Sequence, residues 1–288
     1  MDGNKLIKSP LNYTGGKYKL LPQLLPIILL PPPHKNEINT FVDLFTGGGN
    51  VVANVNAKKR IANDINGSVI DIFKTFQTRA LDDILKEIYS KIEEYNLTID
   101  NQESYNVFRN MYNKSTEKDP IDLFVLICYS FNHQIRFNSK GEYNMPFGKN
   151  RSQFNKTIEQ NLINFHKTIK DVIFTNKSFT ELKVDKLSKD DYVYCDPPYL
   201  ITCASYNEQD GWNETQERQL YELLDNLNER EIRFGLSNVF ENKGNKNEML
   251  IEWSKKYNVH HFNHSYGNCS YHAKNKSKST DEVFITNY

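Results

Sequence analysis

The chain has 288 residues, 36 basic and 36 acidic side chains and seven histidines, and hydrophobic residues make up 38% of it. Its length fits one large α/β domain or a core domain with an insertion, and 17 Phe with 17 Tyr exclude a disordered chain. No apolar stretch approaches the ~20 residues of a membrane span, and the first residues do not resemble a signal peptide.

Short apolar runs predict the strands of a sheet. The first, 39–45, leads into the glycine turn Thr46–Gly49, and residues 51–55 favour the first turns of a helix. The second, 60–65, contains an acid near its end, and further strands are expected at 171–175, 191–195, 233–237, 259–262 and 282–286. Helices fit over 214–229, with Asn213 or Thr215 as the cap, and over 246–256.

The region between the second and third predicted strands has helical periodicity instead. Strands alternating with helices predict an α/β fold with a doubly wound, Rossmann-like parallel sheet, and the interruption predicts an inserted, mostly helical domain. We expect a catalytic core formed by 1–67 and 160–288 and an insertion over 68–159.

The cysteines and histidines do not indicate a metal site or a disulfide framework. The four cysteines share no C-x-x-C spacing, which is typical of reduced thiols, and the histidines are scattered. The cysteines are Cys128, Cys195, Cys203 and Cys269.

The glycine turn lies where open α/β sheets bind ligands, at the carboxyl end of a strand. Asp64 follows Phe45 by nineteen residues and can accept hydrogen bonds from two ribose hydroxyls. An adenosine-type ligand is therefore expected. Val52 stands where the dinucleotide fingerprint needs a third small residue, so an NAD-dependent oxidoreductase is the disfavoured alternative.

The most specific signal is the turn Asp196-Pro-Pro-Tyr199 at the end of a predicted strand. Prolines lack a backbone N–H, so the Asp196 carboxylate and the Pro197 carbonyl form a surface made only of acceptors. Such a surface suits an exocyclic amino group, because accepting both N–H bonds increases the electron density on the nitrogen and lets it attack an electrophile. Tyr199 offers a flat face on which a base can stack.

Five motifs occur in the order typical of Dam-type (class alpha) DNA adenine methyltransferases, a family that the chain resembles from about Asn12 to Asn287. They are Asn12-Tyr-Thr-Gly-Gly-Lys17, Phe41-Val-Asp-Leu-Phe-Thr-Gly-Gly-Gly49, Ile61-Ala-Asn-Asp-Ile65, Arg136-Phe-Asn-Ser-Lys-Gly-Glu-Tyr-Asn-Met-Pro-Phe-Gly148 and Asp196-Pro-Pro-Tyr199. Segments 191–202, 234–238 and 253–258 look most like the phage T-even Dam enzymes.

The resemblance implies S-adenosylmethionine as methyl donor, S-adenosylhomocysteine as product and no metal. It implies methylation of the amino group of a flipped adenine in duplex DNA, with GATC as the expected site. The implied catalytic residues are Asp196, Pro197, Pro198 and Tyr199. The implied cofactor residues are Tyr13 and Lys17 at the methionine end, Phe45 and Gly47 beside the cofactor backbone, Asp64 at the ribose, Ser178 and Phe179 at the adenine ring with Phe179 stacking, and Asp196.

The resemblance implies that the insertion reads DNA and that 136–148 form its DNA-reading hairpin. Five basic residues and one acid lie between Phe131 and Lys156, interleaved with aromatic residues, which fits this role. Arg136 suits bidentate reading of guanine, Phe131 can fill the gap left by the flipped base, and Pro146 or Met145 can touch a thymine methyl. The implied DNA-binding residues are Phe131, Asn132, Gln134, Arg136, Asn138, Asn144 and Pro146, with Lys149 and Arg151 at phosphates. Gln134 and Asn150 depart from the family pattern, which bears on flanking-base preference.

The expected partners are double-stranded DNA and, as a candidate, a restriction endonuclease acting on the same site, with no membrane. The expected location is the cytoplasm, at the nucleoid, for a bacterial or phage-encoded protein. A cytosine amino-methyltransferase is one alternative, disfavoured by Asp196 before the prolines. A catalytically silent sequence-specific DNA-binding protein is another, disfavoured by the intact Asp196 turn together with Lys17 and Asp64.

Overall fold

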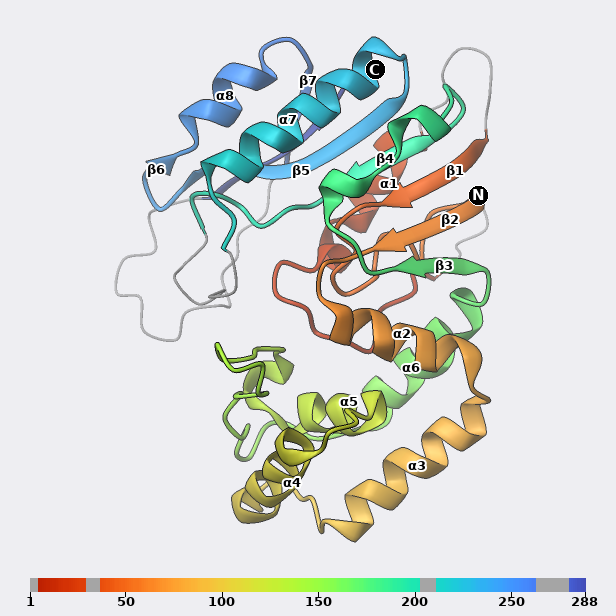
Figure 1. The fold of residues 1–288 in the computed structure, drawn as a ribbon, viewed down its shortest axis with the longest axis vertical. Helices are drawn as coiled ribbons and strands as arrows, with labels where there is room; N and C mark the ends of the chain where they lie inside the picture. The colour runs from red at the N-terminus through yellow and green to blue at the C-terminus, as the bar shows by residue number, and fades with distance from the viewer. Residues whose placement is uncertain (1–4, 30–36, 203–210, 263–279) are drawn as a thin grey trace. The chain divides into compact units, whose positions relative to one another are not determined.

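The computed structural model describes residues 5–29, 37–202, 211–262 and 280–288 (Figure 1). The chain divides into two compact units. The first, which we call the helical unit, comprises Met1–Leu21, Thr46–Asn54 and Ala62–Asn176. The second, the sheet unit, comprises Pro22–Phe45, Val55–Ile61 and Lys177–Tyr288.

The helical unit is organised around one apolar helix, α5 (Pro120–Tyr129). Every residue of α5 from Ile121 onward is buried, because α2, α3 and α4 all pack against it. The helix begins where the Asp119 side chain accepts the N–H of Ile121 at 2.7 Å. The other elements of this unit are η1 (Lys17–Leu20), α2 (Gly67–Thr78), α3 (Leu81–Glu94), α4 (Gln102–Lys114), η2 (Phe131–His133), α6 (Lys156–Thr168) and β3 (Val172–Thr175).

The expected insertion, 68–159, falls within the third segment of the helical unit. In keeping with its helical periodicity, it contains α3, α4, α5, nearly all of α2 and the start of α6. Its assignment as a separate target-recognition domain remains a prediction.

The sheet unit holds most of the strands, in the order β3-β2-β1-β4-β5-β8-β7, with β6 paired to β5. The last two residues of β2 and all of β3 belong to the helical unit. The elements are α1 (Leu21–Ile28), β1 (Ile38–Asp43), β2 (Ala57–Asn63), η3 (Phe179–Glu181), η4 (Val184–Lys186), β4 (Tyr192–Cys195), α7 (Glu214–Glu229), β5 (Arg233–Asn242), β6 (Asn245–Lys246), α8 (Glu248–Ser254), β7 (Asn258–Phe262) and β8 (Thr280–Thr286).

The sheet is mixed, so the expectation of a parallel sheet is correct only in part. β1 pairs with β4 and β4 with β5 in parallel, whereas β8 runs antiparallel to both β5 and β7. Alternating strands and helices signal parallel pairing, but an antiparallel strand needs no crossover helix, and the pattern therefore does not report it.

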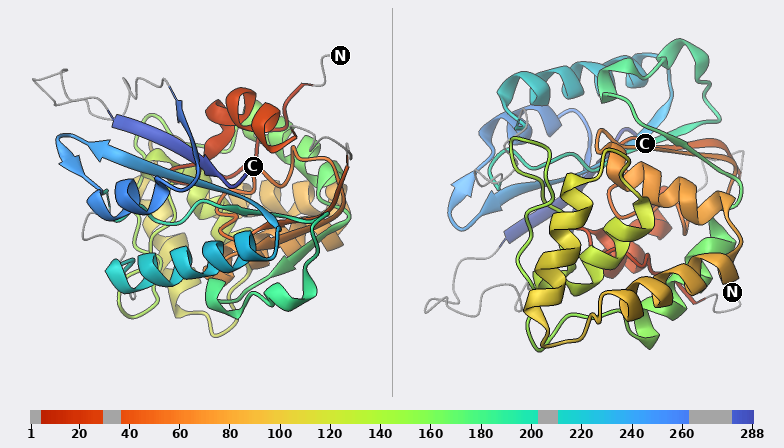
Figure 2. Two further views of the ribbon diagram at one scale, coloured as in Figure 1. Left: turned by 90° about the horizontal axis from the view of Figure 1, so that it is seen from above. Right: turned by 60° about the horizontal axis from the view of Figure 1, so that its bottom comes forward.

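Helices cover both faces of the sheet unit, as the doubly wound arrangement requires: α7 and α8 lie on one face and α1 on the other (Figure 2). The layer between is rich in aromatic side chains, and the rings of Phe41 and Tyr192 stack with centroids 5.7 Å apart. Gly235 on β5 is required here, since a Cβ at that position would lie 2.3 Å from the Phe284 ring.

Two expected helices differ in the structure. Residues 51–54 form turns rather than the start of a helix, with the N–H of Asn54 donating to the Val51 carbonyl at 2.9 Å. The helix expected from residue 246 begins at Glu248 instead. Lys246 belongs to β6, where it pairs with Glu241 of β5, and the Asn247 side chain caps the helix by accepting the N–H of Leu250. Among the described residues, no helix is both long and apolar enough to cross a bilayer.

The parallel register brings strand ends together. Asp43, the last residue of β1, lies opposite Tyr194 of β4, and the Leu44 N–H donates to the Tyr194 carbonyl at 2.9 Å. The residues that follow these strands, Phe45 after β1 and Asp196 after β4, therefore leave the sheet at the same edge, where α/β sheets bind ligands.

Candidate functional site

In the helical unit, the glycine turn is closed by the acid that follows β2. Asp64 accepts the N–H of Gly47 through Oδ2 and that of Asn66 through Oδ1, each at 2.8 Å. Burial raises the pKa of the Asp64 carboxyl, and these two amides oppose the shift. An ionised carboxylate offers about four acceptor positions. These two bonds use two of them, and a ribose diol needs two.

Tyr13 lies against the same turn. A Cβ on Gly47, whose φ is +46°, would lie 3.0 Å from the Tyr13 ring. Burial and then the Asp64 charge raise the pKa of the Tyr13 hydroxyl, so this group stays protonated. The helical unit thus brings together three of the predicted cofactor residues.

Lys17, the other cofactor residue predicted from the first motif, is only 3% exposed. Its Nζ donates to the carbonyl of Gly15 at 2.8 Å. A buried ammonium beside a carbonyl is a suitable partner for an amino-acid carboxylate.

In the sheet unit, the chain turns at Asp196 directly after β4. The hydroxyl of Tyr199 donates to Asp196 Oδ1 at 2.9 Å, a contact that the motif itself does not predict. Burial and then the Asp196 charge raise the pKa of Tyr199, so the hydroxyl remains a donor at physiological pH. Pro197 is buried, Pro198 is exposed, and Asp196 and Tyr199 are half-buried.

Three aromatic rings gather near the same strand ends. The ring centroids of Phe45 and Phe179 are 5.5 Å apart, and Trp212 lies 5.6 Å from Phe45 and 5.4 Å from Phe179. Phe179 is 8% exposed, whereas the other two rings are half-buried. Ser178 has a structural role as well, because it caps η3 in a capping box with Glu181.

The predicted DNA-reading segment forms a hairpin in the helical unit, with isolated antiparallel bridges between Ser130 and Phe147 and between Phe137 and Tyr143. Arg136 donates from Nε to Asn144 Oδ1 at 2.8 Å and from Nη2 to the Asn144 carbonyl at 3.1 Å. The guanidinium is therefore held by its own hairpin. These two bonds use two of its five N–H donors, and three are left for a ligand.

The other predicted DNA-binding residues divide into three groups. Asn138 shapes the hairpin tip, because its Oδ1 accepts the N–H groups of Lys140 and Glu142 at 3.0 Å. Exposed side chains form the second group: Phe131, which is 40% exposed, Asn132, Pro146, Lys149 and Arg151. Gln134 is half-buried and its carbonyl accepts the Tyr143 hydroxyl at 2.9 Å.

Two details refine the predicted roles in this segment. The Arg151 guanidinium lies 5.0 Å from the centroid of the exposed Phe131 ring, so the two side chains present one surface. Met145 is only 3% exposed, so the alternative to Pro146 as a thymine contact is buried instead.

Helix α4 holds this hairpin through side chains that sequence reasoning missed. Tyr105 and Arg109 both donate to the Met145 carbonyl, at 2.9 and 2.7 Å. Asn113 donates to the carbonyl of Tyr143 and accepts its N–H, both at 2.9 Å. The spacing of four residues, which places these side chains on one helix face, is the available signal, but the sequence alone does not reveal their partner.

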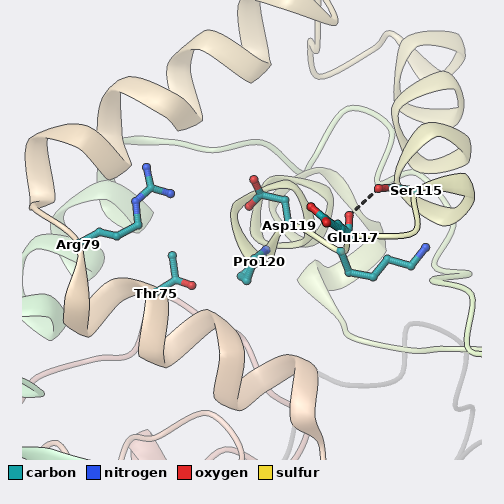
Figure 3. Close-up of a pocket in the computed structure, with 7 residues that line it drawn as sticks. Thr75, Arg79, Ser115, Glu117, Asp119 and Pro120 are labelled. Atoms are coloured by element: carbon teal, nitrogen blue, oxygen red, sulfur yellow. Dashed lines mark hydrogen bonds between the residues drawn. The ribbon is translucent and has the colours of Figure 1, made fainter.

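A shallow pocket of about 440 Å³ lies elsewhere in the helical unit (Figure 3). Its lining is Thr75, Arg79, Ser115, Glu117, Lys118, Asp119 and Pro120. Three of the charged side chains there have internal partners. Arg79 pairs with Glu87, Lys118 donates to the Tyr112 carbonyl at 2.7 Å, and Asp119 accepts the N–H of Ile121. None of the predicted site residues lines this pocket.

Cys128 and Cys195 are free and buried, and Cys203 and Cys269 lie outside the described residues. Burial raises the pKa of the Cys195 thiol. Within the described ranges, no three His, Cys, Asp or Glu side chains form a group that could hold a metal ion.

The fold is α/β with a mixed sheet. It has a glycine turn after β1, an acid after β2 and an Asp-Pro-Pro-Tyr turn after β4, which is consistent with a methyltransferase fold. The family model for the D12 class N6 adenine-specific DNA methyltransferases matches residues 13–268. The chain belongs to this family.

Named relatives extend this finding. The chain is 48% identical to the type II methyltransferase M.FokI of Planomicrobium okeanokoites and 45% identical to the modification methylase StsI of Streptococcus sanguinis, in each case over 99% of this chain and 43% of the relative. It is 27% identical to the DNA adenine methylase of Escherichia coli K12, over 87% of this chain and 85% of that enzyme.

Two consequences follow from these comparisons. The chain spans less than half the length of M.FokI and StsI. The expected particular likeness to the phage T-even Dam enzymes is wrong, because the greater likeness is to these modification methylases. The shared motif order could not separate the two groups.

Proposed function

We propose that this chain transfers the methyl group of S-adenosylmethionine to the exocyclic amino group of adenine in duplex DNA. The observation that carries the proposal is the turn after β4. There the chain leaves the sheet at the same edge as Phe45, and the turn carries the Asp196 carboxylate and the Pro197 carbonyl as acceptors. Family membership supports adenine as the base.

Each unit carries groups that fit one part of the cofactor. In the helical unit, the buried Lys17 ammonium suits the methionine carboxylate, and Asp64 suits the ribose hydroxyls. In the sheet unit, the aromatic rings suit the adenine. When bound, S-adenosylmethionine supplies a methyl group on a sulfonium, which is already a good leaving group.

The chain's own contribution is to hold the amine. Asp196 and the Pro197 carbonyl accept its N–H bonds and orient the nitrogen lone pair for in-line attack, and catalysis comes chiefly from this positioning. Tyr199 orients the Asp196 carboxylate through its hydroxyl and offers its ring to the base. The base reaches this turn only after it is flipped out of the duplex.

The hairpin between Ser130 and Gly148 is proposed to read the target. Arg136 suits a guanine edge, and the exposed Phe131 suits the space left by the flipped base. GATC is the first site to test. A restriction endonuclease with the same site is the proposed partner, by analogy with the names of M.FokI and StsI.

The direct test is sequencing of plasmid from a methylation-deficient host that expresses the chain, with Asp196→Ala as control. N6-methyladenine in one short motif, absent from the control, is the expected result. Modified cytosine would replace the proposed base, and unmodified DNA from a host that contains folded protein would overturn the proposal in favour of a silent DNA-binding protein.

Gly47→Ala is expected to weaken binding of S-adenosylhomocysteine by at least about tenfold. The new Cβ strains a left-handed backbone at a cost of roughly 1–2 kcal/mol, and it meets the Tyr13 ring at 3.0 Å. Calorimetric titration measures the change. Gly141→Ala is the matched control, because Gly141 also has positive φ but nothing lies within 4 Å of its added Cβ; equal loss of affinity in both variants would contradict the assignment.

Tyr199→Phe is expected to lower kcat by about tenfold and to leave the affinity for S-adenosylhomocysteine unchanged. The variant keeps the ring but removes the hydrogen bond to Asp196, and bonds to charged groups contribute about 1.5–3 kcal/mol. Single-turnover methylation of a duplex oligonucleotide measures the rate. A kcat equal to that of the unmodified chain would show that Tyr199 does not orient the carboxylate.

A further inference from the structure

Phe45 and Trp212 form a corner of half-buried aromatic rings in the sheet unit. Their rings meet at an interplanar angle of 80° with centroids 5.6 Å apart. Phe179 contacts both rings but retains only 8% of its surface exposed. The ring predicted to stack on adenine is therefore largely covered by protein, whereas Phe45 and Trp212 retain more of their surface exposed.

The orientation of Trp212 is fixed by a buried carboxylate. Its indole N–H donates to Oε2 of Glu217, which lies on α7 and is 0% exposed. Oε1 of Glu217 accepts the Tyr221 hydroxyl at 2.5 Å and the side-chain amide of Asn238 at 3.3 Å. Asn247 also reaches Oε1, at 3.5 Å.

A carboxylate buried in this way is costly unless its hydrogen bonds are satisfied. Simple packing of an indole against Phe179 would not require it. The network restricts Trp212 to one orientation, and a fixed orientation matters for a surface that receives a ligand, because less ordering remains to be done on binding.

The corner also has the right place. Phe45 follows β1, whose end pairs with β4 immediately before Asp196, and η3, which contains Phe179, packs against α7. A purine that stacks on one ring of a perpendicular pair stands edge-to-face with the other ring. Stacked and edge-to-face arrangements are both favourable for aromatic groups.

We propose that Trp212 binds the adenine ring of S-adenosylmethionine and that Glu217 is the positioning residue that orients it. Phe45 supplies the second side of the corner, and Phe179 supports both rings from behind. This inference rests on the proposed function and names the stacking residue within it.

Tryptophan fluorescence tests the inference without any turnover, because the chain has only two tryptophans. Trp253 stacks on Tyr221 and donates to Asp225 at 2.9 Å, and it does not belong to the corner. In Trp253→Phe, all tryptophan emission comes from Trp212. We expect saturable quenching of that emission by S-adenosylhomocysteine and by adenosine, but not by methionine.

Trp212→Phe is the matched variant, with the same chemical change at the other tryptophan. Its remaining emission, from Trp253, should not respond to S-adenosylhomocysteine. Trp212→Ala should weaken binding of S-adenosylhomocysteine by about 10- to 100-fold, since base–aromatic stacking has an effect of this order. KM for the methyl donor should rise with kcat little changed, and affinity for duplex DNA should remain the same.

Glu217 is tested by two replacements. Glu217→Leu should increase acrylamide quenching of Trp212 in the Trp253→Phe background and weaken S-adenosylhomocysteine binding about as much as Trp212→Ala. Glu217→Gln keeps only a neutral, weaker acceptor for the indole N–H and should lie between Glu217→Leu and the parent in both properties. Equal affinity in Glu217→Leu and the parent would remove the positioning role. If Glu217→Leu does not fold, Glu217→Gln decides, because acrylamide quenching and affinity equal to those of the parent would remove the role.

The outcomes separate this inference from the function beneath it. If Trp253→Phe methylates DNA and binds S-adenosylhomocysteine while Trp212 emission stays constant and Trp212→Ala binds normally, the inference is overturned and the proposed function stands. If the unmodified, folded chain binds no S-adenosylhomocysteine by equilibrium dialysis and leaves DNA unmodified, both are overturned.

Discussion

Asp196→Ala is expected to reduce methyl transfer by at least about 10²–10³-fold, the usual effect of removing one preorganised polar group from a reacting centre. The variant loses the carboxylate that is proposed to accept the N–H bonds of the amine, and also the partner of the Tyr199 hydroxyl. Single-turnover transfer of a labelled methyl group to an oligonucleotide measures the rate. Affinity for DNA should change little, because it depends mainly on phosphate contacts.

Two controls make this result specific. Asp185→Ala removes an exposed acid in η4 of the same unit and should leave the rate unchanged. Asp196→Asn preserves the shape and one carbonyl acceptor and should fall between the parent and the alanine variant. Undiminished transfer by Asp196→Ala would reject the proposed chemistry of the turn, whatever the state of DNA binding.

Arg136→Lys is expected to weaken binding to the sequence that the chain methylates by about 5- to 150-fold. A bidentate contact to guanine contributes about 1–3 kcal/mol of discrimination. Lysine retains the charge but not the planar fork, two of whose donors already contact Asn144. Binding to a duplex with a substituted site should not change. Fluorescence anisotropy with both duplexes, at one stated salt concentration, measures the difference.

Arg151→Ala provides the contrast. The Arg151 side chain is exposed and stacks on Phe131, and as a phosphate contact it should weaken binding to both duplexes equally and reduce the salt dependence. Loss of discrimination in Arg151→Ala, or its retention in Arg136→Lys, would reverse the two assignments.

Local signals in the sequence predicted some elements closely. The bounds of α7 match the expectation, because Asn213 caps the helix and its apolar spacing is regular. Strand β5 is five residues longer than its apolar run, because the extension to Asn242 is stabilised by pairing with β6 and β8, which no local pattern shows. The position of Asp64 beside the glycine turn also follows from sequence, since both come at the ends of strands.

Other features depend on partners far apart in the chain. Trp212 has no motif of its own, and its corner exists only because Phe45 and Phe179 come to it from other segments. The hydrogen bond from Tyr199 to Asp196 depends on the shape of the turn after β4 rather than on residue spacing. Such contacts require tertiary structure, and residue types alone did not predict them.

The hydrogen bonds from α4 to the hairpin have a consequence for how the sequence of the hairpin can change. Tyr105, Arg109 and Asn113 bind main-chain atoms of Met145 and Tyr143. Main-chain atoms are present whatever side chains the hairpin carries, so outward-facing residues can be exchanged while the support stays intact. If the hairpin reads DNA as proposed, substitutions of its outward-facing residues can change the recognised sequence while the contacts from α4 stay the same.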